Sequence, residues 1–266
     1  MRGLLLIAVT ACRFSPGETG TGSGSADAAI PGGDDAQIPG DGSARDPNDH
    51  LIAYYEMETI DSKTAADSSG HHHTATCTSC PTVKAGHKGM GFDFDGTTRF
   101  DVPDDGSFDS STAFTIAIWV KWTMPSYMGQ QYSCPVGKVF QNGIYNSYEL
   151  CSDKTAGKWL YDTTQVDGNG NPQFDSMYAP IAGPKNNDWH HAAMVWDGSV
   201  KTLYIDGMDV MRDMPRTPVF DATGPLTFGA DTDGGLQSSP FTGTADELRI
   251  YDVVLSPSEI AALAAP

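Results

Sequence analysis

The sequence predicts an all-β fold of antiparallel strands, and three observations lead to that prediction. Glycine and proline are abundant, with 29 and 17 residues among 266, while helix-forming residues are sparse. Residues 113–122 alternate between large apolar side chains and other residues, which is the period of a strand. Asp-Gly or Asn-Gly pairs, which favour tight hairpin turns, interrupt the chain at positions 95–96, 142–143, 197–198 and 206–207.

The formal charge of −18 narrows the range of partners. A strongly acidic protein is repelled by nucleic acid and by anionic membrane surfaces, so both are excluded as ligands. The charge suits an extracytoplasmic protein that stays soluble and meets cations.

Residues 1–12 have the pattern of a short secretory signal. Arg2 precedes an apolar run that is too short to span a membrane. The end of this segment, Val-Thr-Ala-Cys, resembles a bacterial lipobox and predicts that Cys12 is the lipidated first residue of the mature protein. Cys12 is also the odd cysteine among five. The alternative is ordinary cleavage near Ala11 with a spare cysteine. A lipid at Cys12 would hold the protein in the bacterial cell envelope, as its only contact with a membrane.

Residues 13–49 are rich in Gly, Ser, Ala, Pro and Asp, and contain almost nothing to bury. Such a segment does not offset its ordering entropy, which predicts a disordered, extended tether. The folded domain is therefore predicted to cover residues 50–266.

The first segment of this domain, residues 51–57, is predicted to be a strand, and residues 67–70 (Asp-Ser-Ser-Gly) a turn. Three consecutive histidines follow at 71–73. Neighbouring residues of a strand point to opposite faces, so these three side chains do not converge on one zinc ion.

Cys77 and Cys80 have the spacing of a redox motif. That chemistry requires a helix N-terminus to stabilise the thiolate, and no helical pattern follows here. A structural disulfide between them is the better interpretation.

A second hairpin is predicted around the Asp-Gly pair at 95–96, with strands near residues 89–94 and 99–103. In the segment 113–122, one face carries Phe114, Ile116, Ile118, Val120 and Trp122 and is predicted to form core. Each such side chain stabilises the fold by about 1.5–3 kcal/mol when fully buried.

The Asn-Gly pair at 142–143 predicts a two-residue turn, which fixes a register in which the numbers of paired residues add to 285. Cys134 and Cys151 then face each other at a non-hydrogen-bonded position, where side chains approach most closely. A disulfide there would stabilise the fold by roughly 3 kcal/mol. Two unpaired thiols are the alternative, which export disfavours.

The segment 189–210 reads as three short strands joined by two Asp-Gly turns. Near the C-terminus, residues 241–252 form a further predicted strand. Ser256 and Glu259 then make a capping box with proline at the first helical position, which predicts a short helix over residues 260–265.

Taken in order, these motifs resemble the laminin-G-like, concanavalin A-like jelly-roll domains of bacterial surface proteins. The resemblance covers residues 50–266 and includes the opening strand, the Asp-Ser-Ser-Gly turn, the Phe-Asp-Gly hairpin, the Phe-Thr-Ile strand and the closing strand. Its signature is the Trp-His-His strand leading to two Asp-Gly turns, at Trp189, His190, His191, Asp197, Gly198, Tyr204, Asp206 and Gly207.

The resemblance implies a jelly-roll sandwich of two antiparallel sheets with a short C-terminal helix. It also implies a structural calcium ion, with Asp67 and Asp246 at the matching positions. Calcium takes six to eight oxygen ligands, which the Gly/Ser turn could supplement with carbonyl groups. The alternative is that Asp67 caps its own turn and Asp246 is a solvated strand residue.

Three functions are compatible with the resemblance, because one fold hosts many functions. The first is a non-catalytic module that binds carbohydrate or a surface glycoprotein. The second is a glycoside hydrolase or lyase, which needs paired carboxylates; the nearest stretch, Glu56 to Asp61, has the wrong order. The third is a purely structural protein. Exposed aromatic residues around a groove would favour the first, and the candidates are Tyr127, Tyr132, Tyr145, Trp159, Tyr161 and Tyr178.

Overall fold

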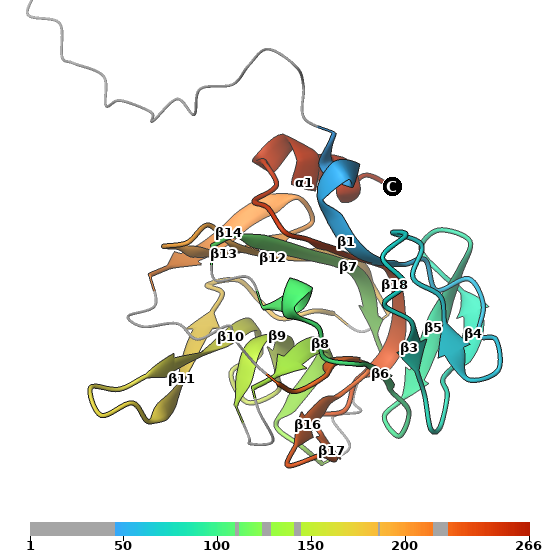
Figure 1. The fold of residues 1–266 in the computed structure, drawn as a ribbon, viewed down its shortest axis with the longest axis horizontal. Coiled ribbons are helices and arrows are strands. Elements are labelled where there is room, and N and C mark those ends of the chain that lie inside the picture. The colour runs from blue at the N-terminus through green and yellow to red at the C-terminus, as the bar shows by residue number, and fades with distance from the viewer. Residues whose placement is uncertain (1–45, 110–111, 124–128, 141–144, 186, 215–222) are drawn as a thin grey trace, which may run out of the picture. The chain divides into compact units, whose positions relative to one another are not determined.

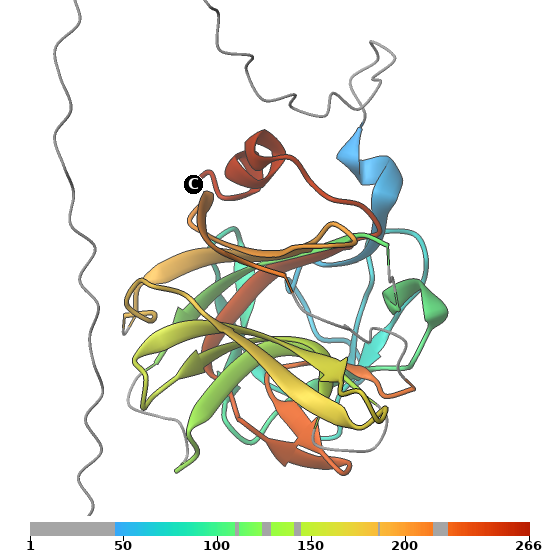
Figure 2. The same cartoon turned by 90° about the vertical axis from the view of Figure 1, so that its left-hand side faces the viewer.

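The computed structural model describes residues 46–109, 112–123, 129–140, 145–185, 187–214 and 223–266. Two large antiparallel sheets pack face to face, as Figures 1 and 2 show in two views. The predicted all-β jelly-roll sandwich is therefore confirmed. Among the described residues no helix has the length and apolar character needed to cross a membrane.

Sheet A contains both the meander of segment 189–210 and the predicted closing strand. Its strands lie in the order β14 (Met208–Asp213), β13 (Lys201–Ile205), β12 (Trp189–Trp196), β7 (Phe114–Trp122), β18 (Thr242–Tyr251), β5 (Met90–Asp95) and β4 (Thr82–Ala85), and β1 (Leu51–Tyr55) pairs with β18.

Sheet B holds the long central hairpins and several short strands. The order is β11 (Pro172–Tyr178), β10 (Lys158–Val166), β9 (Asn146–Asp153), β8 (Tyr132–Val139), β15 (Leu226–Phe228), β6 (Phe100–Val102), β3 (Ala75–Thr76) and β2 (Thr64–Ala65). A separate hairpin of β16 (Asp231–Asp233) and β17 (Leu236–Ser238) follows β15. Two 3-10 turns, η1 (Pro47–His50) and η2 (Gly106–Phe108), complete the description with helix α1 (Pro257–Leu263).

The main core lies between the two sheets. The predicted apolar face of β7 is buried there. Trp122 from β7 meets Trp159 from β10 edge-on, with ring centroids 5.1 Å apart. A buried ion pair also joins the sheets, because Lys201 of β13 contacts Asp175 of β11 at 2.7 Å. Most of the stabilisation comes from apolar burial, at about 1.5–3 kcal/mol for each large side chain.

Helix α1 covers part of the outer face of sheet A. Its capping box forms as predicted: the Ser256 hydroxyl accepts from the Glu259 N–H, and the Glu259 carboxylate accepts from the Ser256 N–H. Ile260 of α1 is buried against a second apolar cluster that includes Ala117 and Tyr204. Both faces of β7 are therefore covered.

The two Asp-Gly turns of the meander differ from each other. Asp206 and Gly207 both have positive φ, of 52° and 78°, as a two-residue hairpin turn requires. At the earlier turn Gly198 alone has positive φ, and the Asp197 carboxylate accepts hydrogen bonds from the N–H groups of Ser199 and Val200. This side-chain cap allows a different turn there.

Candidate functional site

A pocket of about 280 Å³ lies on the outer face of sheet B, and we call it the acidic pocket. In β9 and β10 the side chains of Tyr148, Leu150 and Tyr161 enter the main core. Their sequence neighbours Glu149 and Asp162 point to the other face and line the pocket. Further lining residues are Tyr132, Asn146, Leu160, Phe174, Ser176, Asp231, Asp233 and Ser239. Asp231 and Asp233 belong to the β16–β17 hairpin, which Figure 1 shows on the side of sheet B away from sheet A.

The register of β8 and β9 shapes this site, and it differs from the predicted one in the middle of the hairpin. Tyr132–Asp153 and Val139–Asn146 pair as predicted, but the pairs between Val136 and Lys138 are shifted by one residue. The predicted turn at 142–143 lies outside the described residues. The shift begins at the extra residue Pro135, which lacks the N–H that a regular ladder requires.

The shift ends at a second extra residue, Ser147 on β9. This bulge reverses the alternation, so Asn146 lines the acidic pocket although it is two residues from the core residue Tyr148. Bulges re-aim side chains in this way beside functional sites.

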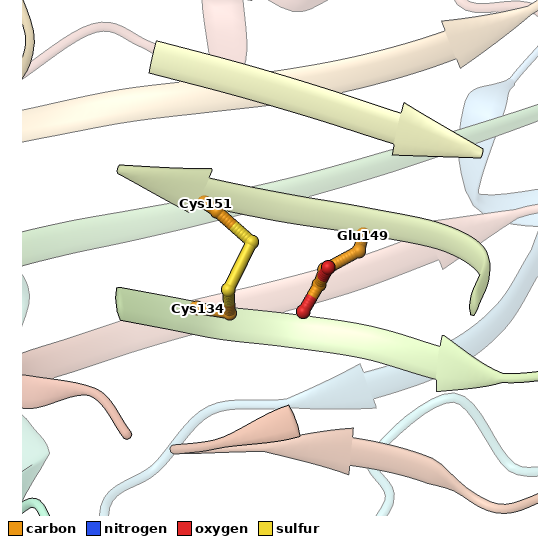
Figure 3. Close-up of side chains that lie close together, drawn as sticks. All are labelled: Cys134, Glu149 and Cys151. Atoms are coloured by element: carbon orange, nitrogen blue, oxygen red, sulfur yellow. A yellow bond between two sulfur atoms is a disulfide. The ribbon is translucent and has the colours of Figure 1, made fainter. Parts of the chain in front are cut away.

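The predicted disulfide between Cys134 and Cys151 is confirmed and lies beside Glu149 (Figure 3). These three residues are the group of neighbouring metal-ligand types found among the described residues. The two sulfur atoms are bonded to each other, so they are not thiolate ligands. The group therefore does not fit a metal ion. With Leu160, the two cysteines form a small apolar cluster that supports the adjacent carboxyl group.

Glu149 is one of three buried carboxyl groups in the pocket, with Asp162 and Asp231. Its side chain passes over Gly137 on β8, where a Cβ atom would lie 3.2 Å from the Glu149 Cγ. Its Oε1 atom is buried and has no hydrogen-bond partner in the protein. Burial, followed by the charges of Asp231, Asp162 and Asp233, raises the pKa of Glu149 well above its ordinary value. Burial and the neighbouring charges therefore favour the protonated form of Glu149, which both donates and accepts hydrogen bonds.

Asp162 and Asp231 line the pocket beside Glu149. Burial raises the pKa of each to about 6. The Asp162 carboxylate accepts from the Ser176 hydroxyl at 3.2 Å, and that of Asp231 from the Ser238 hydroxyl at 3.2 Å. Both are largely ionised at neutral pH, so the pocket carries net negative charge.

Aromatic side chains lie at the rim. Phe174 is 49 % exposed and packs against Tyr145, with ring centroids 4.6 Å apart. Tyr132 also lines the pocket. An exposed ring beside hydrogen-bonding groups can stack on the apolar face of a small polar ligand.

A second pocket of about 300 Å³ lies on the outer face of sheet A, against the C-terminal residues. We call it the ion-pair pocket, because its charged side chains pair with one another. Glu247 forms a salt bridge with Arg249, and Lys88 lies 3.5 Å from Glu247. The Tyr54 hydroxyl donates to Glu247 at 2.8 Å and accepts from Arg249 at 2.7 Å.

The structure gives Asp67 and Asp246 separate sets of donors. Asp67 Oδ1 accepts from the N–H groups of Tyr54 and Ser69, and its Oδ2 from the Ser69 hydroxyl and the His73 N–H. Burial opposes ionisation of Asp67, but these hydrogen bonds outweigh burial and lower its pKa. Four hydrogen bonds fill the acceptor positions of one carboxylate.

Asp246 Oδ2 accepts from the N–H groups of His87 and Lys88, each at 2.8 Å. Its Oδ1 is buried without a partner, and burial raises its pKa to about 7. One free acceptor atom on Asp246 and a fully engaged Asp67 carboxylate do not fit a calcium ion shared by the two residues.

The remaining sequence predictions have mixed outcomes. The disulfide between Cys77 and Cys80 is confirmed. Cys12 and Tyr127 lie outside the described residues. Of the candidate aromatic residues, Tyr132 lines the acidic pocket and Tyr145 contacts its rim residue Phe174. Tyr178 packs against the apolar cluster at the Cys134–Cys151 disulfide, whereas Trp159 and Tyr161 are core.

Sequence reasoning missed the carboxyl groups of the pocket. Glu149, Asp162 and Asp231 come from three strands, and no short motif contains them. One signal was available: Glu149 is two residues from Cys151, so the predicted disulfide and Glu149 must share a face of β9.

Comparisons with known proteins agree with this architecture. The laminin-G-type family model described as the concanavalin A-like lectin/glucanases superfamily matches residues 94–261. Two curated relatives, from Rattus norvegicus and Mus musculus, are named "Sushi, von Willebrand factor type A, EGF and pentraxin domain-containing protein 1". Each is 26% identical over 170 residues, which is 60% of this chain but 4% of the relative.

Solved structures share the fold at low sequence identity. Domain 4 of AbnA, a GH43 extracellular arabinanase from Geobacillus stearothermophilus in complex with arabinotriose, is similar with a TM-score of 0.58 and 21% identity, over 81% of this chain and 98% of that domain. The binding domain of Paraclostridial Mosquitocidal Protein 1 has a TM-score of 0.65 and 16% identity, over 82% of this chain and 52% of its own. The binding domain of botulinum neurotoxin DC, in complex with rat synaptotagmin II, has a TM-score of 0.58 and 15% identity, over 82% and 52%.

Proposed function

Because the chain belongs to the concanavalin A-like lectin/glucanases superfamily, we propose that it is a non-catalytic module that binds carbohydrate in the acidic pocket, either as a free glycan or on a surface glycoprotein. The observation that carries the proposal is the set of buried acceptor atoms that the protein leaves unpaired in the pocket wall, Glu149 Oε1 and Asn146 Oδ1. Buried polar atoms are almost always hydrogen-bonded. A ligand rich in hydroxyl groups supplies the missing donors.

Two further features support a sugar ligand. Phe174 offers an exposed ring for stacking against a pyranose or furanose face. The similar domain 4 of AbnA was solved with arabinotriose, and the similar toxin domains are described as binding domains.

A glycoside hydrolase is the second candidate, and the pKa values of the carboxyl groups favour it. Burial favours the protonated form of Glu149, while its neighbours Asp162 and Asp231, each with a pKa of about 6, are largely ionised at neutral pH. This resembles the division between acid and base that glycosidases use. Release of reducing ends from a bound glycan, abolished in Glu149→Gln, would establish catalysis. Bound glycan that stays intact would leave the binding module as the function.

A glycan array tests the proposed function. We expect the wild-type domain to bind a restricted set of glycans, and both Phe174→Ala and Glu149→Leu to lose most of that signal. Met208→Ala is the matched control, because Met208 is an exposed apolar residue on sheet A. Absence of bound glycans, or binding that both pocket variants retain, would overturn the proposal.

We also propose that a lipid on Cys12 and the segment 13–49 hold this module in the bacterial cell envelope. The lipobox-like residues 9–12 support the proposal. In cells grown with a palmitate probe, the wild-type protein should carry the label and the Cys12→Ala variant should not. Equal labelling of both proteins would refute the anchor.

A further inference from the structure

The acidic pocket is lined by charges of one sign. Four carboxyl groups line it, from Glu149, Asp162, Asp231 and Asp233. Within the described part of the chain no lysine, arginine or histidine is among the lining residues. Lys201 interacts with Asp162, but its ammonium group is fully buried and hydrogen-bonded to Asp175. The described wall of the pocket therefore presents carboxyl groups and no cationic side chain.

The unpaired atoms of the pocket are acceptors. Glu149 is 6% exposed and Asn146 is 5% exposed, and each has a side-chain oxygen without a partner. Ionised carboxylates accept hydrogen bonds and donate none. The complementary ligand group therefore carries several donors and a positive charge. A primary ammonium group, with three donors and no acceptor, has both properties.

The size of the pocket limits the ligand to a small unit. Its volume of about 280 Å³ lies at the lower end of ligand-binding pockets. The β16–β17 residues Asp231 and Asp233 bound it on one side, and Phe174 and Ser176 of β11 line it on the other. One sugar ring fits this description better than a long stretch of polymer.

Resting on the proposed function, we propose that the acidic pocket selects a sugar that carries a protonated amine, such as a non-acetylated hexosamine, over neutral and anionic sugars. The ammonium group lies among Glu149, Asp162 and Asp231, and the ring packs on Phe174. A buried charge is tolerated only when it is paired and hydrogen-bonded. The carboxylates offer that pairing to an amine. A uronic acid or a sulfated sugar instead adds a like charge to the cluster, which opposes binding.

Three trisaccharides that share one linkage and differ at the second carbon test this selectivity: the β-1,4 trimers of glucosamine, glucose and N-acetylglucosamine. Titration calorimetry with the whole domain is carried out in weakly acidic buffer that keeps the amines protonated. The glucosamine trimer should bind at least about tenfold more tightly than the glucose and N-acetylglucosamine trimers. An oligomer of glucuronic acid should bind most weakly. Added salt should weaken binding of the glucosamine trimer more than that of the glucose trimer.

Two variants locate the charge that selects the amine. Asp231→Asn and Asp162→Asn keep the shape of the side chains, and each should weaken binding of the glucosamine trimer several-fold more than binding of the glucose trimer. Asp252→Asn is the control, because Asp252 pairs with His50 rather than lining the pocket. Circular dichroism of each variant establishes that it is folded.

The outcomes separate this inference from the proposed function. Equal affinity for all three trimers, or an undiminished preference in both variants, overturns the amine selectivity and leaves carbohydrate binding in place. Binding of none of the sugars overturns the proposed function itself. A lysine derivative such as Nα-acetyl-lysine amide that binds as tightly as the glucosamine trimer would show that the pocket recognises ammonium groups without the sugar.

Discussion

The acidic pocket and the ion-pair pocket are of similar volume, about 280 and 300 Å³, and lie on the outer faces of the two sheets. The two pockets differ in whether their charged side chains pair with one another. In the ion-pair pocket, Glu247, Arg249 and Tyr54 satisfy one another through a salt bridge and two hydrogen bonds. In the acidic pocket, carboxyl groups gather, none of the described lining residues is a cation, and Glu149 keeps an unpaired oxygen.

This difference shows that pocket size does not identify a binding site in this molecule. Charges that pair internally contribute to the fold, because removing one leaves the other buried without a partner. Buried carboxyl groups gathered without a neighbouring cation in the lining destabilise the fold, and such an arrangement is typical of sites that bind or react. The ion-pair pocket is therefore expected to support stability, and the acidic pocket to support ligand binding.

The largest effect is expected at the ion-pair pocket. Glu247→Ala leaves Arg249 without its carboxylate partner and Tyr54 without its acceptor, and should reduce the free energy of unfolding by about 3–5 kcal/mol. Urea unfolding measures the change. Glu56→Ala, at an exposed position of the same region, should alter stability by less than about 0.5 kcal/mol. If both variants lost equal stability, the ion-pair network would have no structural role.

A smaller effect of opposite sign is expected in the acidic pocket. Burial raises the pKa of Asp231 from 3.8 to about 6, so the folded state binds its proton more tightly than the unfolded state. The resulting destabilisation is absent below pH 3.8, grows as the pH rises, and is complete above about pH 6. Asp231→Asn removes the charge and should raise the unfolding free energy at neutral pH by an amount on the order of 1–2 kcal/mol.

Urea unfolding at several pH values checks this prediction. The gain should disappear in acid, where the wild-type Asp231 is already protonated. Asp95→Asn provides the opposite control, because hydrogen bonding from the Thr97 N–H lowers the pKa of Asp95. The stabilisation by Asp95 is present above its ordinary pKa and is lost as the pH falls. A pH-independent gain in Asp231→Asn would contradict the buried-charge explanation.

The parts of the fold that sequence predicts well depend on local patterns. The alternation in β7, the meander of β12, β13 and β14, and the capping box of α1 each lie within one short segment. The disulfide between Cys134 and Cys151 followed from the register of a single hairpin. Local patterns suffice where the determining interactions are between residues close in sequence.

The acidic pocket escaped prediction because its residues meet only after the sheet has formed. Glu149, Asp162 and Asp231 lie on β9, β10 and β16, and the last strand is about 80 residues along the chain from the first. The bulge at Ser147 that turns Asn146 into the pocket breaks the alternation on which the register argument relied. At Asp67 the family motif predicted a metal ligand. In the structure, backbone N–H groups donate hydrogen bonds to its carboxylate oxygens instead.

The smallest effect is expected from calcium, which sharpens the contrast between satisfied and unsatisfied carboxylates. A ligand that binds only the folded state raises the melting temperature. Asp67 has two hydrogen bonds on each oxygen, so a calcium ion would have to displace donors that already stabilise its charge. Asp246 offers one free oxygen and is partly protonated at neutral pH, because burial raises its pKa to about 7.

We therefore expect the melting temperature of wild type to be the same in millimolar calcium and in chelator. Asp67→Ala should melt at a lower temperature by an equal amount in both conditions, because it loses the turn cap rather than a metal. A calcium-dependent rise in wild type that disappears in Asp67→Ala and in Asp246→Asn would show that the two carboxylates rearrange around an ion.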